Sequence, residues 1–125
     1  MTWGLWCVLI AGLLPYLGTM AAKWGFNRFD NNNPRDWLNK QTGFRARGNS
    51  AQANSFEAFP LFAAAVLVAT YLKAPQASID GLATVFVIAR ILYIGCYVTD
   101  RASLRSLCWL VGIASAVGLF VVSAQ

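Results

Sequence analysis

Residues 45–69 read RARGNSAQANSFEAFPLFAAAVLVA, and this stretch decides the fold because it carries polar groups into an apolar run. Two arginines open it, and a run of aliphatic residues that a lipid bilayer would accept closes it. Between them lie Asn54 and Glu57, followed by Pro60. In a helix, Ser50, Asn54 and Glu57 recur at i, i+4 and i+7 and therefore share one face. The stretch is predicted to be a membrane helix with one polar face.

The composition of the chain supports this interpretation. Of the 125 residues, 58% are apolar and 12% are charged, whereas a soluble domain usually carries about 25% charged residues. Apart from Asp80, four blocks contain no charge: residues 3–22, 58–72, 77–89 and 106–124. Long uncharged blocks that alternate with short charged ones are typical of a polytopic membrane protein, and the length allows one domain.

Four blocks are long enough to span a bilayer, since a helix needs about 20 residues to cross about 30 Å of hydrocarbon. The predicted spans are residues 3–22, 50–72, 77–98 and 103–123. Pro15 is expected to kink the first span. Backbone polar groups in lipid must form hydrogen bonds within a helix or a closed barrel. The spans lack the two-residue alternation of apolar and polar residues that a barrel would show, so helices are predicted. The predicted fold is all-α, a single four-helix membrane domain over residues 1–125 with one substantial polar loop at 23–49.

The basic residues indicate an orientation. Six of the ten lie in the loop 23–49, and Arg101 and Arg105 mark the third connection, while the opposite side has only Lys73. The positive-inside rule places the first and third loops in the cytoplasm and both termini on the other side. This bias accounts for the net charge of +5, so no nucleic-acid partner is expected.

Ionisable residues inside the predicted spans are few, and such residues usually face a protein interior and have a partner. Arg90, Tyr93 and Tyr97 recur at i, i+3 and i+7 and share one face. In one interpretation Glu57 and Arg90 neutralise each other across a helix interface. In the other, the polar faces line a pocket for a zwitterionic, polyanionic ligand, with arginines on its carboxylates and Glu57 on its ammonium. The pattern leaves both open.

The chemistry available to such a pocket is limited. The chain has no histidine, and its three cysteines, Cys7, Cys96 and Cys108, stand apart in apolar surroundings. No metal site is therefore predicted, and the cysteines are interpreted as small packing residues. A cationic arginine or a hydroxyl donor would still stabilise the thiolate of a bound thiol.

The motifs together resemble those of the MAPEG family, the membrane-associated proteins in eicosanoid and glutathione metabolism. Residues 54–57, NSFE, match the N-x-x-E signature of the family's second helix and are followed by Pro60. ARILYIGCY at 89–97 is similar to the third-helix pattern, and SLRS at 103–106 to the start of the fourth. The chain is identified on this basis as a bacterial-type member.

The resemblance implies a homotrimer in a bacterial inner membrane, with glutathione bound as co-substrate near the cytoplasmic face. The implied function is a glutathione-dependent transferase or peroxidase acting on lipophilic electrophiles. Arg105 is implied to activate the thiol, with Ser106 as a neighbouring hydroxyl. The implied glutathione ligands are Arg47, Asn54, Glu57, Arg90, Tyr93 and Tyr97.

Two positions depart from the family pattern. Ser50 stands where the leukotriene and prostaglandin synthases carry an arginine, and Arg47, one turn earlier, is the expected substitute. Ala58 stands where some members have tyrosine. The missing arginine favours an alternative function, a non-catalytic membrane accessory or scaffold protein that retains the fold. A small transporter is disfavoured, because the chain has no internal repeat and no broken pair of helices.

Overall fold

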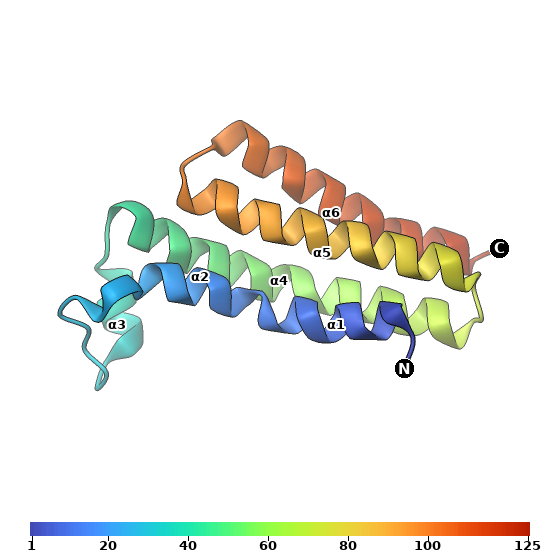
Figure 1. Cartoon of the computed structure of the whole chain (residues 1–125), viewed down its shortest axis with the longest axis horizontal. Helices are drawn as coiled ribbons and strands as arrows, with labels where there is room; N and C mark the ends of the chain where they lie inside the picture. The colour runs from blue at the N-terminus through green and yellow to red at the C-terminus, as the bar shows by residue number, and fades with distance from the viewer.

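The computed structural model describes all 125 residues as an elongated, all-helical bundle (Figure 1). Four of its helical segments are long and apolar enough to cross a membrane, which confirms the predicted all-α, four-span fold. The elements are α1 (Trp3–Leu13), α2 (Pro15–Ala22), the 3-10 turn η1 (Trp24–Phe26), α3 (Pro34–Asn39), α4 (Gly43–Tyr71), α5 (Gln76–Val98) and α6 (Ala102–Ser123).

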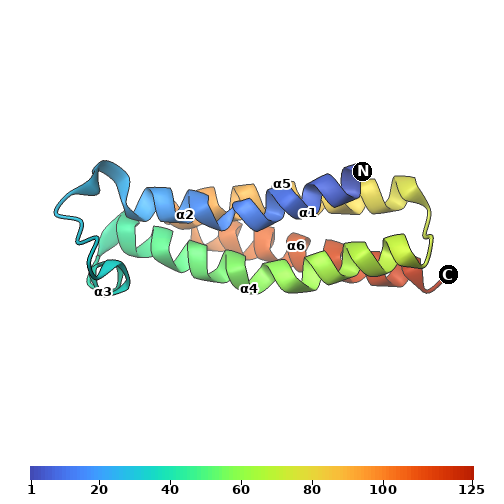
Figure 2. The same cartoon turned by 90° about the horizontal axis from the view of Figure 1, so that it is seen from below.

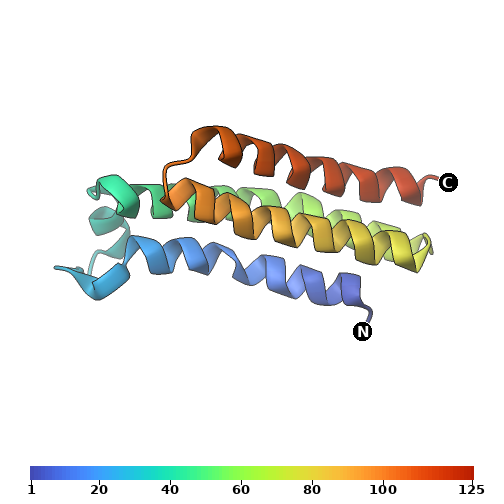
Figure 3. The ribbon, with the colours of Figure 1, turned by 45° about the horizontal axis from the view of Figure 1, so that its top comes forward.

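The pair α4 and α5 lies at the centre of the bundle, and the other long helices cover it on two sides. Figure 3 shows α6 on one side of this pair and α1 and α2 on the other. Both termini and the α4–α5 connection lie at one end of the bundle, and the first loop with α3 lies at the opposite end (Figures 1 and 2). The basic first loop and the α5–α6 turn therefore share one end, which we call the basic end.

The first span is bent at the position predicted from Pro15. Leu14 separates α1 from α2 but keeps helical angles, φ −57° and ψ −35°, so the chain changes direction without leaving the helix (Figure 1). Proline has no N–H to donate to the carbonyl one turn earlier, and this missing bond permits the bend. Pro60, by contrast, lies inside an unbroken α4.

One helix start differs from the prediction by more than one residue. α4 begins at Gly43 rather than near residue 50, so the connection from the first span is shorter than the predicted loop 23–49. Hydropathy locates the part of a helix that lies in hydrocarbon, and the polar first turns of α4 continue the same helix beyond that zone. α5 and α6 begin one residue before their predicted starts.

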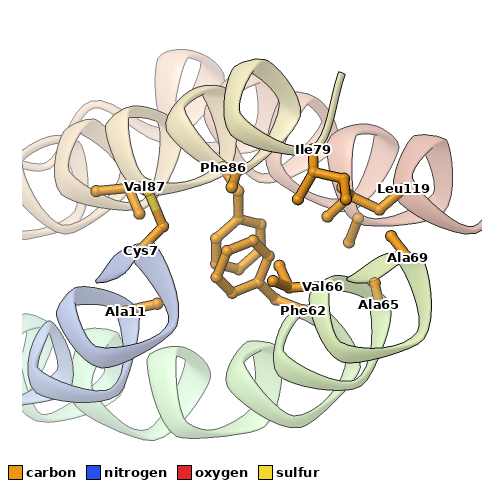
Figure 4. Packing of buried hydrophobic residues seen from close by; sticks show 12 residues of the cluster. Cys7, Ala11, Phe62, Ala65, Val66, Ala69, Ile79, Phe86, Val87 and Leu119 are labelled. Carbon is orange, nitrogen blue, oxygen red and sulfur yellow. The ribbon is translucent and has the colours of Figure 1, made fainter. Parts of the chain in front are cut away.

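The apolar core occupies the half of the bundle nearer the termini. Twelve buried residues from α1, α4, α5 and α6 form it. At its centre the rings of Phe62 and Phe86 stack with centroids 3.8 Å apart (Figure 4). Cys7 and Ala11 of α1 approach from one side and Leu119 of α6 from another. This core fixes α4 against α5 and thereby positions the polar residues that follow toward the basic end.

Near the basic end the helices approach closely. A Cβ atom added to Gly48 would lie 2.8 Å from the Gly18 carbonyl oxygen, so α2 and α4 touch through their backbones, as small residues allow in membrane helices. Arg45 Nη1 donates to the Ala22 carbonyl at 3.2 Å, and Arg47 Nε donates to the Val98 carbonyl at 3.1 Å. Both arginines thus bind carbonyl groups at helix C-termini, where positive charge is favourable.

At the other end, Asp80 of α5 fastens the start of α1. The Gly4 N–H donates to Asp80 Oδ1 at 2.8 Å, and Gln76 Nε2 donates to the same oxygen at 2.8 Å. A carboxylate at a helix N-terminus satisfies a free N–H and complements the helix dipole. The one acidic residue in the otherwise uncharged blocks is therefore a cap for a neighbouring helix.

Candidate functional site

Arg90 is the centre of the polar cluster between α4 and α5. Its side chain is only 3% exposed, and Nη2 donates to Asn54 Oδ1 at 2.8 Å and to Ser55 Oγ at 3.1 Å. The Tyr93 ring lies 4.0 Å from the guanidinium carbon. A buried cation is therefore surrounded by neutral groups, an amide, a hydroxyl and an aromatic ring.

Glu57 does not neutralise this cation. The only ion pair in the chain joins Lys40 to Asp36 in the first loop, at 2.8 Å. Glu57 is exposed, on the same wall of α4 as Asn54. Of the two interpretations that the sequence left open, pairing between Glu57 and Arg90 is not what the structure forms.

A cavity of about 270 Å³ opens beside Arg90 between α4, α5 and α6. Its polar wall consists of Asn54, Glu57 and Arg90, and the remaining walls are apolar. The apolar lining residues are Ala58, Leu61, Phe86, Trp109, Ile113 and Ala116. A ligand with charged groups at one end and an apolar part at the other matches this division.

From Arg90 a row of two tyrosine rings, which we call the aromatic ladder, leads to Arg105 at the basic end. The Tyr93 and Tyr97 rings meet edge to face with centroids 5.7 Å apart, and the Arg105 guanidinium lies 4.3 Å from the Tyr97 ring. Cations over aromatic faces are held by the ring quadrupole. The face predicted from the spacing of Arg90, Tyr93 and Tyr97 is present, and α6 brings Arg105 onto it.

Five of the eight predicted site residues do not line the cavity, which are Arg47, Tyr93, Tyr97, Arg105 and Ser106. Arg47 is half-buried and bonded to the Val98 carbonyl, so in this conformation it closes the end of α5. Ser50 and Ser106 are exposed, and neither lines the cavity. All the predicted ligand roles, and the predicted catalytic roles of Arg105 and Ser106, stay predictions.

The contribution of α6 to the cavity was not predicted from the sequence. Trp109, Ile113 and Ala116 recur at i, i+4 and i+7, so their common face was visible in the sequence. Which helix that face meets depends on the register between α4 and α6, and no local pattern encodes it. Ser55 was also missed, although it lies inside the N-x-x-E motif and holds Arg90.

The model of the MAPEG family matches residues 3–125. The chain belongs to the MAPEG family. Neither the search of curated proteins nor that of solved structures gives a match. Membership confirms the resemblance drawn from the second-helix, third-helix and fourth-helix motifs, and it places the chain in a membrane-protein family that includes glutathione transferases and peroxidases.

Proposed function

We propose that this MAPEG protein is a glutathione-dependent transferase or peroxidase that acts on lipophilic electrophiles. One observation carries the proposal: a nearly fully buried Arg90 with neutral partners lies beside an unpaired Glu57 in the same cavity. An uncompensated charge in a membrane protein interior costs at least a few kcal/mol. A ligand that brings a carboxylate and an ammonium together would neutralise both residues, and glutathione has both groups.

Each polar residue has a role in this proposal. Arg90 binds a carboxylate, with Asn54 holding its guanidinium in place, and Glu57 accepts hydrogen bonds from the ammonium. The hydroxyl groups of Tyr93 and Tyr97 donate to the tripeptide. Arg47 is a further proposed ligand, which would have to leave the Val98 carbonyl to reach it.

Arg105 is the proposed activating residue. Its positive charge at the end of the aromatic ladder stabilises the thiolate of bound glutathione, and Ser106 offers a hydroxyl to the same sulfur. In the transferase reaction the thiolate forms an S–C bond and the leaving group departs with its electron pair. In the peroxidase reaction the thiolate attacks one peroxide oxygen, the O–O bond breaks and an alcohol leaves. A second glutathione then converts the sulfenic acid to glutathione disulfide and water.

The electrophile is proposed to reach the sulfur from the bilayer. Leu61, Trp109 and Ile113 supply apolar walls of the cavity. At about 270 Å³ the cavity is smaller than the about 300–1,000 Å³ of typical ligand pockets. We infer that a neighbouring copy completes it, as in a homotrimer.

The basic end is proposed to face the cytoplasm of a bacterial cell, with both termini on the outer side of the inner membrane. Loops rich in lysine and arginine stay in the cytoplasm, and the first loop and the α5–α6 turn share that end (Figure 1). Glutathione would then enter from the cytoplasmic side, next to Arg105.

Calorimetric titration of the purified protein with glutathione, followed by turnover assays, tests the proposal. We expect binding with a Kd below about 1 mM, which corresponds to about −4 kcal/mol, and conjugation of a lipophilic aryl halide or reduction of a lipid hydroperoxide. Glu57→Gln should weaken binding, because the neutral amide cannot compensate the ammonium. Absence of any binding heat at millimolar glutathione would contradict the proposal.

A non-catalytic accessory or scaffold role is the second candidate. It is favoured by Ser50, which leaves the cavity without the arginine of the related synthases, and by Arg47, which is engaged at Val98. Under this alternative, Arg105→Ala would retain the full biological role of the protein. Under the enzymatic proposal the same variant loses it.

A further inference from the structure

A groove of about 630 Å³ opens at the end of the first span, where α2 leads into the 3-10 turn η1. It is lined by Thr19, Met20, Lys23, Trp24, Gly25 and Phe26. None of these residues lines the cavity beside Arg90, so the groove is separate from the candidate functional site. Figure 1 shows this segment at the basic end, where the span passes into the first loop.

The apolar wall of the groove exposes large aromatic side chains. Trp24 and Phe26 are 68% and 69% exposed. Phe26 also has a left-handed backbone with φ of 49°, next to Gly25 with φ of 74°, and a non-glycine residue in this region carries backbone strain. The Phe26 ring meets Phe29 edge to face at 5.9 Å, but this contact does not bury it. An apolar chain lying in the groove would cover both exposed rings.

Lys23 is the one cation that lines the groove. Its Nζ lies 4.6 Å from the centroid of the Phe29 ring, and it has no acidic partner, because the only ion pair in the chain joins Lys40 to Asp36. The ring holds the ammonium without neutralising its charge. The first loop, residues 23–49, adds a positive surrounding, with six basic residues and two acidic ones. An anionic group is therefore the complement of this wall.

The groove lies at the level expected for lipid headgroups. The first membrane-spanning segment ends at Phe26, inside the groove, and the polar loop follows. Tryptophan is enriched at this level of a membrane, and lysine extends its ammonium toward the headgroups while its carbon chain stays in apolar surroundings. A molecule with an apolar chain and an anionic head thus matches both the lining and the depth of the groove.

We propose that this groove binds an anionic phospholipid, with its phosphate next to Lys23 and one acyl chain along Met20 and Phe26. A lipid is favoured over a soluble phosphate ester because most of the lining is apolar and lies at the end of a span. The proposal is independent of the proposed function, since no residue of the candidate glutathione site takes part in it.

The opposite end of the molecule provides a matched control. Tyr71, Leu72 and Lys73 are an aromatic, an aliphatic and a basic residue at the end of α4, and the first two are exposed. No groove is lined by these residues. They should therefore attract anionic lipid by charge alone, without holding one molecule in place.

Native mass spectrometry of the full chain in a non-ionic detergent tests the lipid preference, with phosphatidylglycerol and phosphatidylcholine added at equal concentration. The wild-type protein should retain one phosphatidylglycerol per chain in preference to phosphatidylcholine. Lys23→Gln should lower this preference about fivefold, the effect of one basic residue next to an anionic headgroup. Lys23→Arg and Lys73→Gln should keep it. Excess glycerol phosphate, which has no acyl chain, should not displace the lipid.

Brominated lipids, which quench nearby tryptophans, test the position of the bound lipid in phosphatidylcholine nanodiscs. Trp24→Phe removes one emitter, so the difference between wild-type and variant emission reports Trp24 alone. This difference should be quenched more strongly by brominated phosphatidylglycerol than by the same share of brominated phosphatidylcholine. The corresponding difference for Trp3→Phe, at the opposite end, should be quenched equally by both lipids.

Four results would overturn the proposal. Equal retention of the two lipids by the wild-type protein would show no anionic site. Equal loss in Lys23→Gln and Lys73→Gln would assign the preference to bulk charge. Displacement by glycerol phosphate would make the groove a site for soluble anions. Absence of any selective quenching of Trp24, as when a neighbouring copy covers the groove, would contradict the position and decides the matter even if Lys23→Gln does not fold. Failure of the proposed function is measured separately, as absence of glutathione binding.

Discussion

Arg90 is the residue on which the candidate site depends. Its guanidinium is buried, and its hydrogen-bond partners Asn54 and Ser55 are neutral. Removing one member of a buried ion pair is strongly destabilising because the other charge is left unpaired, whereas replacing the whole pair by apolar residues of similar volume is often neutral. Since Arg90 has no anionic partner within the chain, we expect its charge to contribute more to ligand binding than to the stability of the fold.

Arg90→Met should therefore separate binding from stability. We expect the affinity for glutathione to fall at least tenfold, or about 1.4 kcal/mol. The free energy of unfolding should fall by no more than about 1–2 kcal/mol, which is the cost of leaving Asn54 and Ser55 without their hydrogen-bond donor. Calorimetry and thermal unfolding in detergent measure the two quantities. Arg101→Met, in the exposed α5–α6 turn, is the matched control, and equal affinity in both variants would contradict the role of Arg90.

Tyr97 is predicted to act through Arg105. Because the guanidinium rests 4.3 Å from the Tyr97 ring, Tyr97→Phe keeps the aromatic face while Tyr97→Leu removes it. We expect turnover to fall severalfold in the leucine variant by displacement of Arg105, with a smaller loss in the phenylalanine variant, since a cation–π contact contributes about 0.5–2 kcal/mol. Steady-state rates at saturating glutathione measure this. An equal loss in both variants would assign the effect to the hydroxyl instead.

At the basic end, α2 and α4 pack through close backbone contact rather than through large side chains. Gly18 and Gly48 let α2 and α4 touch, and this contact fixes the start of α4, from which Asn54 and Glu57 project. The packing of this element pair is thus a condition for the geometry of the site.

Gly48→Ala should disrupt that contact. The added Cβ would lie 2.8 Å from backbone atoms of α2, which cannot move aside as a flexible side chain can, so we expect a loss of about 1–3 kcal/mol in the free energy of unfolding. Gly81→Ala in α5 is the control, because nothing lies within 4 Å of its Cβ position. That variant should be neutral or stabilised by up to about 1 kcal/mol through helix propensity. Similar unfolding curves for both variants would contradict the close approach.

The helices themselves were more predictable from the sequence than the contacts between them. Charge-free blocks revealed four spans, and Pro15 revealed the bend, because both are local effects of hydropathy and backbone chemistry. The start of α4 at Gly43 was missed, since helices extend past the hydrocarbon that hydropathy detects. The bond from Arg47 to Val98 and the position of Trp109 beside the polar wall of the cavity depend on the register between helices, which a single sequence does not specify.

At the scale of the whole molecule, charge asymmetry and the position of the site point to the same end. The basic loops and the Arg105 end of the ladder lie together, away from both termini (Figure 1). Cytoplasmic glutathione can therefore reach the site only if the basic end faces the cytoplasm, as proposed.

Reporter fusions after Gln125 test the orientation. In a bacterial host, we expect alkaline phosphatase fused there to be active and green fluorescent protein to be dark, because the positive-inside rule places that end outside the cytoplasm. A fusion placed after Asn31, in the first loop, should give the reverse pattern. Fluorescence from the C-terminal fusion would contradict the orientation.

The central claim is that the cluster around Arg90 and Arg105 binds glutathione and ionises its thiol, and ultraviolet difference absorbance tests it most directly. On adding purified protein to glutathione near neutral pH, we predict a saturable thiolate band that disappears on addition of a non-thiol analogue, S-methylglutathione. Arg105→Ala should lose the band while it retains most of the binding heat. Saturable binding without any thiolate band in the wild-type protein, or a band of equal height in Arg105→Ala, would contradict the claim.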